Sequence, residues 1–233
     1  ALAYDAAGNV TSSTDTAGRM TSSTYDNINR VSGTTDANNK TTSFQYDALS
    51  RVTGVLDAPN QQYQLAYDAL GRQTQITRGG VSMSYAYDAV GNRTQRTDYN
   101  GTLTQYAYDN INRLTTIVYP ARTVTYGYDP LNNLTRAANE NGTVYISYDN
   151  RYRVSSFSDP FFYGISYNYD TAGNRTKLKL NGATYATYTY DAVGRLQRKD
   201  QGNHTYTTFE YDAAGQLLHL VNHAPAGSVN SRF

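Results

Sequence analysis

The feature that most constrains this chain is a Tyr-Asp pair that recurs eleven times, at steps of 20 or 21 residues. A fixed period in this range is typical of an array of identical supersecondary units, in which each unit contacts only its neighbours. We therefore expect residues 1–233 to form a single Tyr-Asp repeat array of about eleven repeats. The tyrosines of the pairs are Tyr4, Tyr25, Tyr46, Tyr67, Tyr87, Tyr108, Tyr128, Tyr148, Tyr169, Tyr190 and Tyr211.

The composition excludes several classes of function. Charged residues make up 17% of the chain and the net charge is +1, so attraction to nucleic acid or to an anionic membrane is not expected. There is no cysteine for disulfides or thiolate metal sites, and no apolar run long enough for a membrane span or a signal peptide. The chain starts inside a repeat, and Val229–Phe233 leads up to where the next strand would begin. We therefore expect an array truncated at both ends.

The residues before each Tyr-Asp pair alternate between two kinds. Met83, Tyr85 and Tyr87 share one parity, while Ser84 and Ala86 occupy the other. An alternation with period two and one aromatic face predicts a half-buried β-strand, and tyrosine, threonine and valine favour strands.

A tight turn is expected after each of these strands. Aspartate can accept backbone N–H bonds from the residues that follow it, and glycine or asparagine three positions later readily adopts a positive φ. Asp88 and Gly91 show this pattern, which is typical of a type I turn followed by a left-handed residue. Ser50 and Tyr152 depart from it, and at Tyr152 we predict a distorted or longer loop.

A second strand and a second turn complete each repeat. The strand starts with an apolar residue such as Leu114, and another such as Ile117 often follows three positions later, which predicts a bulge or bend. The second turn is often Asn-Gly, as at Asn141-Gly142, and this pair is a strong hairpin signal. We expect the difference between 20 and 21 residues to lie mainly in this turn. A further copy of the first turn at Asp15 indicates that both edges of the sheet can use the same loop chemistry.

These elements predict an all-β fold, a repetitive antiparallel β-hairpin meander of about twenty-two strands. So wide a sheet would twist, and a flat one would leave its tyrosine face in water. Burying a large apolar or aromatic side chain is worth roughly 1.5–3 kcal/mol. We therefore expect a curled or spiral ribbon that forms part of a hollow shell or barrel.

The repeat motif supplies the candidate site residues, and we expect them to be structural. Each aspartate can cap its own turn, whereas the paired carboxylates of glycoside hydrolysis should be unique in a chain. His219 and His223 are four residues apart, but they lack cysteine or carboxylate neighbours at ligand spacing. No catalytic, cofactor-binding or metal-binding residue is therefore predicted. The structural repeat motif residues are Tyr25, Asp26, Tyr46, Asp47, Tyr67, Asp68, Gly71, Tyr87, Asp88, Gly91, Tyr108, Asp109, Tyr128, Asp129, Tyr148, Asp149, Tyr169, Asp170, Gly173, Tyr190, Asp191, Gly194, Tyr211, Asp212 and Gly215.

A group of arginines allows two interpretations. Arg72, Arg113, Arg153 and Arg195 recur just after the turns and could form a basic row that binds a ligand. The simpler expectation is that they lie along the sheet edge and pair with turn aspartates or water, where exposed pairs contribute little.

Two stretches carry a family resemblance. Tyr108–Thr115 reads YDNINRLT and Tyr190–Leu196 reads YDAVGRL, and both resemble the signature Y-D-x-x-G-R-L-T of the Rhs/YD-repeat family. The resemblance extends over essentially the whole chain. It implies a long β-sheet ribbon wound into a hollow shell, which in bacterial members encloses a variable C-terminal toxin domain and in teneurins forms an extracellular adhesion barrel. Asp129-Pro130 superficially resembles the family's D-P-x-G self-cleavage motif but lies in ordinary repeat register.

We predict a non-enzymatic, structural segment of such a shell, which encapsulates a toxin or other cargo domain without a cofactor. Its expected partners are the rest of its own repeat array and an encapsulated C-terminal toxin domain, and exposed strand edges favour self-association. The resemblance implies a secreted or cell-surface location reached through a bacterial secretion system. The alternative is an extracellular adhesion or carbohydrate-binding module, in which tyrosine and asparagine would contact a sugar. Glycan titration distinguishes the two.

Overall fold

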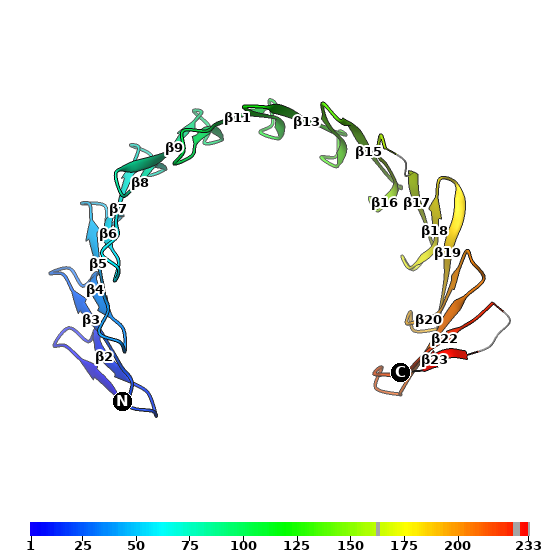
Figure 1. Cartoon of the computed structure of the whole chain (residues 1–233), viewed down its shortest axis with the longest axis horizontal. Coiled ribbons are helices and arrows are strands. Elements are labelled where there is room, and N and C mark those ends of the chain that lie inside the picture. The colour runs from blue at the N-terminus through cyan, green and yellow to red at the C-terminus, as the bar shows by residue number, and fades with distance from the viewer. Residues whose placement is uncertain (162–163, 226–228, 233) are drawn as a thin grey trace. The chain divides into compact units, whose positions relative to one another are not determined.

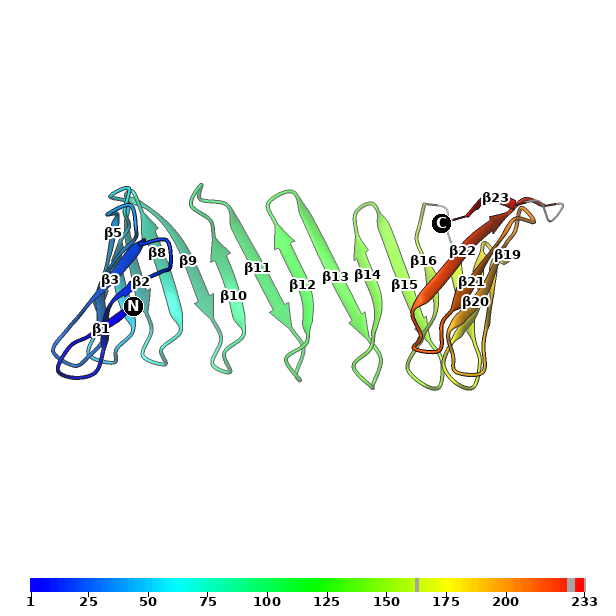
Figure 2. The same cartoon turned by 90° about the horizontal axis from the view of Figure 1, so that it is seen from below.

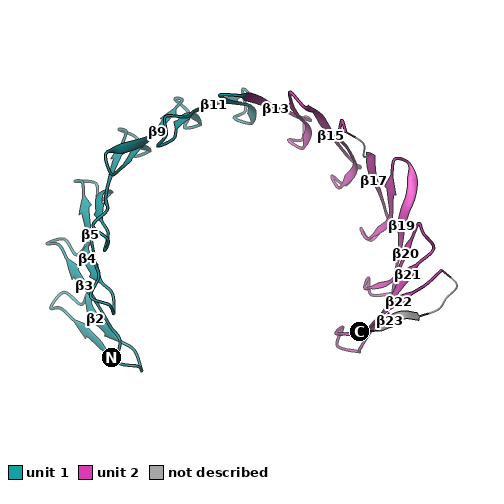
Figure 3. Ribbon diagram, viewed as in Figure 1, with its two compact units in different colours: residues 1–121 teal, residues 122–233 magenta. Residues whose placement is uncertain are grey.

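Every regular element in the computed structural model is a β-strand, within the residues that it describes, 1–161, 164–225 and 229–232. The chain divides into two compact units, residues 1–121 and 122–233 (Figure 3). The described residues form 23 strands, one more than the number expected. The additional strand is Val229–Arg232, which pairs with the strand before it instead of leading up to a missing one. Phe233 lies outside the described residues.

The strands of each unit follow one another in chain order (Figure 1). Unit 1 contains β1 (Leu2–Tyr4), β2 (Val10–Thr14), β3 (Met20–Tyr25), β4 (Val31–Thr35), β5 (Thr41–Tyr46), β6 (Val52–Leu56), β7 (Gln62–Tyr67), β8 (Gln73–Arg78), β9 (Val81–Tyr87), β10 (Arg93–Thr97), β11 (Leu103–Tyr108) and β12 (Leu114–Tyr119). Unit 2 contains β13 (Arg122–Tyr128), β14 (Leu134–Asn139), β15 (Gly142–Tyr148), β16 (Val154–Ser158), β17 (Gly164–Tyr169), β18 (Arg175–Leu180), β19 (Ala183–Tyr190), β20 (Leu196–Gln201), β21 (Tyr206–Tyr211), β22 (Leu217–His223) and β23 (Val229–Arg232).

Within each unit, consecutive strands pair in antiparallel fashion, from β1 with β2 to β11 with β12 and from β13 with β14 to β22 with β23. Figure 2 shows neighbouring strands lying side by side in a single layer. The all-β antiparallel meander is therefore confirmed. Among the described strands of either unit, no pairing joins the first strand to the last, so each unit is an open sheet rather than a closed barrel.

The Tyr-Asp turns have the predicted geometry. At Asp109, the N–H of Asn112 donates to the Asp109 carbonyl at 3.0 Å, and the Asp109 N–H donates to the Arg113 carbonyl at 2.9 Å. Asn112 is left-handed, with φ 65°. The same two bonds occur at all eleven Tyr-Asp turns. These short connections fix the register of each hairpin.

The prediction of a distorted or longer loop at Tyr152 is wrong. Tyr152 adopts φ 62° and donates its N–H to the Asp149 carbonyl at 3.0 Å, as Ser50 does to Asp47. The Asp149 carboxylate also accepts the N–H groups of Arg151 and Arg153 at 2.9 and 3.0 Å. A left-handed residue that is not glycine costs about 1–2 kcal/mol. The bonds to Asp149 offset this cost, so the turn keeps its shape.

A β-bulge follows every Tyr-Asp turn, as the apolar spacing predicted. Tyr108 pairs with Leu114 and Ala107 pairs with Thr116, which leaves one residue of β12 unmatched between them. The same register shift occurs in all eleven Tyr-Asp hairpins. The bulge explains the spacing of three, because Leu114 and Ile117 then lie opposite two tyrosines, Tyr108 and Tyr106.

Turns at the opposite edge account for the two repeat lengths. The two-residue turns at 79–80 and 140–141 lie in repeats with a 20-residue step between tyrosines. The two-residue turn at 181–182 lies in a 21-residue step, and there an unmatched Tyr185 in β19 supplies the additional residue. At this edge, the turns that begin at Asp15, Asp36, Asp57 and Asp98 repeat the bonds of the Tyr-Asp turn. The expectation that both edges share one loop chemistry is thus confirmed.

The sheet has little enclosed core. Among the described residues no large side chain is fully buried, and the buried residues are all small: Gly33, Gly54, Thr104, Ala138, Ala186 and Thr207. The chain exposes 14903 Å², whereas a compact monomer of its mass would expose about 10,500 Å². The tyrosine face is therefore covered by neighbouring repeats of the same sheet rather than by a second layer. Contacts between repeats must then supply much of the stability of the fold.

Candidate functional site: the inter-repeat joint

The candidate functional site is the inter-repeat joint. We define it as the turn aspartate of one repeat, the residue four positions after that aspartate, and the Tyr-Asp pair of the next repeat. Each joint lies at the sheet edge formed by the Tyr-Asp turns, where β-strands of two neighbouring repeats meet.

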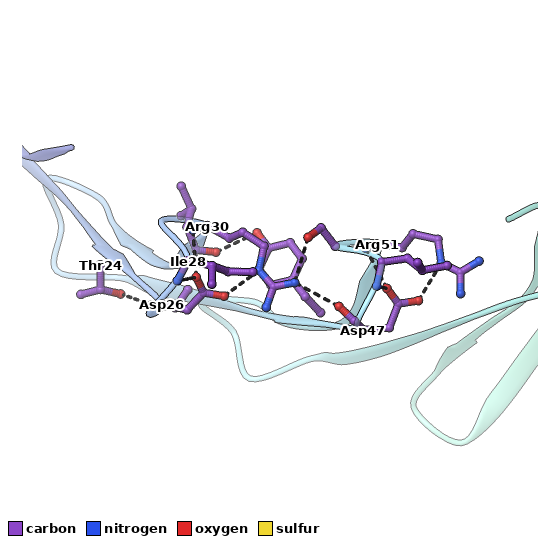
Figure 4. A network of polar contacts seen from close by, with 11 residues as sticks. Thr24, Asp26, Ile28, Arg30, Asp47 and Arg51 are labelled. Atoms are coloured by element: carbon purple, nitrogen blue, oxygen red, sulfur yellow. Dashed lines mark hydrogen bonds and ion pairs between the residues drawn. The ribbon is translucent and has the colours of Figure 1, made fainter. Parts of the chain in front are cut away.

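The aspartate carboxylate organises its own turn through both oxygens. Oδ1 of Asp26 accepts the N–H groups of Ile28 and Arg30 at 3.0 and 2.9 Å, and Oδ2 accepts Nε of Arg30 at 2.6 Å (Figure 4). The Arg30 backbone N–H holds the pKa of Asp26 below its ordinary value of 3.8, and the Arg30 side chain and the Ile28 backbone N–H act in the same direction. Because these donors favour the charged carboxylate, the turn is built around an ionised aspartate.

The same effect recurs along the chain. At Asp68, Asp88 and Asp170, burial is the largest single influence and raises the pKa, yet the combined hydrogen bonds still lower it. The other aspartates with a lowered pKa are Asp5, Asp15, Asp36, Asp47, Asp109, Asp149 and Asp191.

The tyrosine of each pair reaches back to the repeat before it. The hydroxyl of Tyr67 in β7 donates to the carbonyl of Val52, the first residue of β6, at 2.8 Å. The β6–β7 ladder ends at the pair of Gly54 with Gln64, so this bond adds a link between two repeats beyond the end of their ladder. Equivalent bonds of 2.7–3.0 Å are made by Tyr25, Tyr46, Tyr87, Tyr108, Tyr148, Tyr169, Tyr190 and Tyr211.

An arginine completes several joints. Nε of Arg51 bonds to Oδ2 of Asp47 in its own turn at 2.6 Å, and Nη1 donates to the carbonyl of Asp68 in the next turn at 3.3 Å. The Arg51 guanidinium carbon also lies 4.8 Å from the centre of the Tyr67 ring. This distance is within the range of cation–π attraction. One guanidinium thus joins a carboxylate, a carbonyl and an aromatic face of two repeats.

The contact between arginine and tyrosine recurs in both units. Arg30, Arg72, Arg153 and Arg195 lie 4.2–4.9 Å from the ring centres of Tyr46, Tyr87, Tyr169 and Tyr211, respectively. Figure 4 shows two successive joints, with Arg30 bonded to Asp26 and reaching the turn of Asp47, and Arg51 bonded to Asp47.

Asparagine replaces arginine in other joints. Nδ2 of Asn9 bonds to Oδ2 of Asp5 and to Oδ1 of Asn29 in the next turn, both at 2.9 Å. Asn92 bonds to Asp88 and to Asn112 in the same way, also at 2.9 Å. Asn133 and Asn174 keep the bond to their own turn aspartates, at 2.9 and 3.1 Å.

The structure brings the predicted tyrosines and aspartates of successive repeats together at these joints. The predicted glycines Gly71, Gly91, Gly173, Gly194 and Gly215 all have φ between 82° and 101°. Positive φ at these positions allows the turn to close without the steric cost of a side chain.

The arginines pair with turn aspartates, which confirms the simpler of their two interpretations. Arg72, Arg113 and Arg195 bond to Asp68, Asp109 and Asp191 through Nε, at 2.6–2.7 Å. Sequence reasoning missed a second role of Arg72, Arg153 and Arg195, the contact with the next tyrosine. A signal was present, since each of these arginines precedes a Tyr-Asp tyrosine by 15 or 16 residues.

The histidines and the Asp-Pro pair occupy ordinary positions in the array. His219 contacts Glu210 at 2.9 Å, while His223 stacks on Tyr206 with ring centres 4.2 Å apart. Asp129 accepts the Leu131 N–H at 2.9 Å, as the other turn aspartates do. Within the described ranges, no three His, Asp or Glu side chains are grouped as metal ligands would be. In the same part of the chain, no helix has the length and apolar character needed to cross a membrane.

Comparison with known proteins places this geometry in a family. A family model described as RHS Repeat matches residues 4–41, 25–60, 87–124 and 190–229, together more than half of the chain. No curated protein matches significantly.

Several solved structures have the same fold. The crystal structure of TcdB2-TccC3-TEV has a TM-score of 0.53 and 15% identity, over 97% of this chain and 16% of that chain. The crystal structure of TcdB2-TccC3 has a TM-score of 0.52 and 17% identity, over 99% and 16% of the two chains. A Tc holotoxin pore of Photorhabdus luminescens with a TccC3 mutation has a TM-score of 0.52 and 18% identity, over 94% and 15%. This chain thus corresponds to about a sixth of each of these longer chains, and on its matched repeats it belongs to the RHS repeat family.

Proposed function

We propose that this chain is a non-catalytic wall segment of a shell that encloses a toxin or other cargo domain. The observation that carries the proposal is the repeated joint, in which hydroxyl, carboxylate and guanidinium or amide groups tie each repeat to the next. The fold similarity to TcdB2-TccC3, which has one crystal structure without its hypervariable C-terminal region, supports the same function.

The physical basis of such a wall is continuity. The antiparallel ladder satisfies the backbone groups between neighbouring strands, and the joint adds side-chain bonds beyond the point where the ladder between two repeats ends. Each repeat is then held on two sides by copies of itself. A ribbon of this kind gains rigidity from its length without requiring a deep core.

The proposal extends to partners and location. The partners are further repeats of the same array and an enclosed C-terminal toxin domain, and the location is secreted or at the cell surface. The motif residues, from Tyr25 and Asp26 to Asp212 and Gly215, then have a structural role, within a single array that continues beyond both ends of the chain. Edge strands such as β1 are the expected points of self-association.

Limited proteolysis of the full-length gene product that contains this chain tests the proposal. If a shell encloses a cargo domain, that domain resists protease in the intact protein. It becomes sensitive when strand pairing in the wall is disrupted. Gln105→Pro should disrupt the pairing, because Gln105 pairs with Gln95 on one side and with Val118 on the other. Proline has no backbone N–H to donate to a neighbouring strand.

Asn110→Pro is the matched control. Asn110 holds the position after the turn aspartate, where Pro130 already stands in another repeat, so this proline leaves the ladder intact. A cargo domain cleaved equally in wild type, Gln105→Pro and Asn110→Pro would refute enclosure. Saturable glycan binding by the protein would instead favour the adhesion module.

A further inference from the structure

The joints of Arg30, Arg51, Arg72 and Arg195 contain what we call a guanidinium seat. Its parts are Oδ2 of a turn aspartate, the face of the next Tyr-Asp tyrosine, and the carbonyl of the aspartate beside that tyrosine. At Arg195 these parts are Asp191 at 2.7 Å, the Tyr211 ring centre at 4.9 Å, and the Asp212 carbonyl at 3.1 Å. The chain therefore shows directly how this pocket of groups holds a guanidinium.

The joint at Asn174 has the seat but no arginine of its own. The Tyr190 hydroxyl donates to the Arg175 carbonyl at 2.9 Å, so the ring is fixed as in the other joints. Asn174 uses its Nδ2 on Asp170 and has no bond to the next turn, because the residue that would meet it is Gly194, which has no side chain. The Asn–Asn bridges that close the joints of Asn9 and Asn92 are thus absent here, among the described residues.

A groove is present where the missing arginine would lie. It has a volume of about 760 Å³ and is lined by Asp170, Asn174, Tyr190, Asp191 and Gly194, among others. Within the described ranges, no cation lies over the Tyr190 ring and no arginine or lysine forms an ion pair with Asp170. The ring face and the carboxylate are therefore available together.

The charges around the groove favour a cation. The Asp170 carboxylate is bonded by the Asn174 amide, which carries no charge, whereas Asp191 is already paired with Arg195. The arginines around it are engaged elsewhere: the Arg175 guanidinium lies 4.7 Å from the Tyr188 ring centre, Arg153 pairs with Asp149, and Arg151 donates to the Thr171 carbonyl at 2.6 Å. A planar cation entering the groove would meet an aromatic face, a carboxylate and a backbone carbonyl, which is the set that holds the chain's own arginines.

We propose that the groove between Asp170 and Tyr190 is a binding site for a guanidinium group, presented as an arginine side chain by another polypeptide. Arginine fits better than lysine, because its planar fork can stack on the ring and donate to the carboxylate and carbonyl at once. The site does not depend on the function proposed above, since its parts lie within one joint of unit 2.

The joint at Asn133 serves as an internal comparison. Its groove of about 640 Å³ is lined by Asp129, Asn133, Tyr148 and also by Arg136, a cation. Nη1 of Arg136 bonds to the Thr125 hydroxyl at 3.3 Å, so this arginine stays beside the groove. We expect its positive charge to weaken the binding of a second guanidinium there.

Fluorine NMR of the full chain, with a single fluorotyrosine at position 190, tests the site. The ligand is the peptide acetyl-Gly-Arg-Gly-amide, and the controls carry citrulline or lysine in place of arginine. The arginine peptide should shift the resonance saturably in the millimolar range, and the citrulline peptide should bind about tenfold more weakly because it lacks the charge. Equal shifts with all three peptides would overturn the proposal.

Two variants make the test specific. Asn174→Arg places the chain's own arginine in the seat, as in the repeats of Arg72 and Arg195, and should abolish binding of the arginine peptide while the thermal midpoint stays level or rises. Arg195→Asn should open a new seat, detected with fluorotyrosine at position 211, because Gly215 again leaves asparagine without a bridging side chain. Undiminished binding by Asn174→Arg, or no binding at position 211 in folded Arg195→Asn, would contradict the assignment.

Discussion

At the scale of single residues, the tyrosine of the Tyr-Asp pair acts through both its ring and its hydroxyl. The ring covers the preceding repeat, and in five joints it carries an arginine on its face. The hydroxyl bonds to a carbonyl beside the bulge, where strand pairing is interrupted. Phenylalanine would preserve the first role and lose the second, so the two can be measured separately.

We predict that Tyr67→Phe lowers the free energy of unfolding by about 1 kcal/mol, the usual contribution of one such hydrogen bond. The reason is the loss of the 2.8 Å bond from the Tyr67 hydroxyl to the Val52 carbonyl. Urea unfolding followed by circular dichroism measures the change.

Tyr185→Phe is the control, since Tyr185 is 50% exposed and its hydroxyl has no hydrogen-bond partner among the described residues. Its urea midpoint should match that of the wild type. Equal effects of Tyr67→Phe and Tyr185→Phe would show that the hydroxyl contributes nothing to the joint.

At the scale of the hairpin, the turn is set by its aspartate more than by the residue in the left-handed position. Glycine, asparagine, serine and tyrosine all occupy that position with positive φ, as at Gly91, Asn112, Ser50 and Tyr152. Sequence reasoning placed the turns correctly because aspartate and glycine chemistry is local. It failed at Tyr152 because it gave the intrinsic preference of one residue more weight than the bonds accepted by Asp149.

Tyr152→Gly should therefore raise the free energy of unfolding, by about 0.5–1 kcal/mol. Removing the side chain relieves the left-handed strain of about 1–2 kcal/mol, and the greater freedom of glycine in the unfolded chain offsets part of the gain. The Tyr152 side chain is 60% exposed, so little packing is lost. The urea midpoint reports the change.

Gly91→Ala provides the opposite substitution. Gly91 has φ 100° with nothing within 4 Å of an added Cβ, so only backbone strain should act, and the midpoint should fall. A lower midpoint for Tyr152→Gly would mean that the Tyr152 side chain stabilises its turn in a way that the turn geometry does not explain.

At the scale of the whole chain, the small stability contributions of each turn and joint are repeated along the array. The strand contacts within each unit join elements that are neighbours in the sequence, so stability is the sum of similar repeats and of the joints between them. Any condition that weakens one turn weakens the others in the same way. Acid is such a condition, because the turns depend on ionised aspartates.

We predict that the protein is stable at neutral pH and loses stability progressively as the pH falls below about 4. Folding lowers the pKa of the turn aspartates below the ordinary 3.8, so the folded state binds fewer protons than the unfolded state in this window. The stability that the ionised aspartates contribute is fully present above their pKa in the unfolded chain. It is lost as the pH falls through their lower pKa values in the folded protein. Urea midpoints measured from pH 7 to pH 2 test this.

Asp26→Asn removes one of these titrating groups and serves as the comparison. It should be less stable than wild type at pH 7, and the difference should narrow in acid. A urea midpoint for the wild type that does not change between pH 5 and pH 2 would contradict the role of the charged turns.

The sequence by itself determined the repeat, the alternation of each strand, the Asp turns and the bulge, because each depends on residues close together in the chain. The tertiary structure decided which groups meet across repeats: the tyrosine hydroxyl on a carbonyl 14 or 15 residues earlier, and the arginine on the next tyrosine. These contacts depend on the register of neighbouring strands and on the direction of each side chain at the edge. A periodic sequence repeats the same residues in every unit, but only the paired strands place one unit's arginine over the next unit's ring, or leave that place open at Asn174.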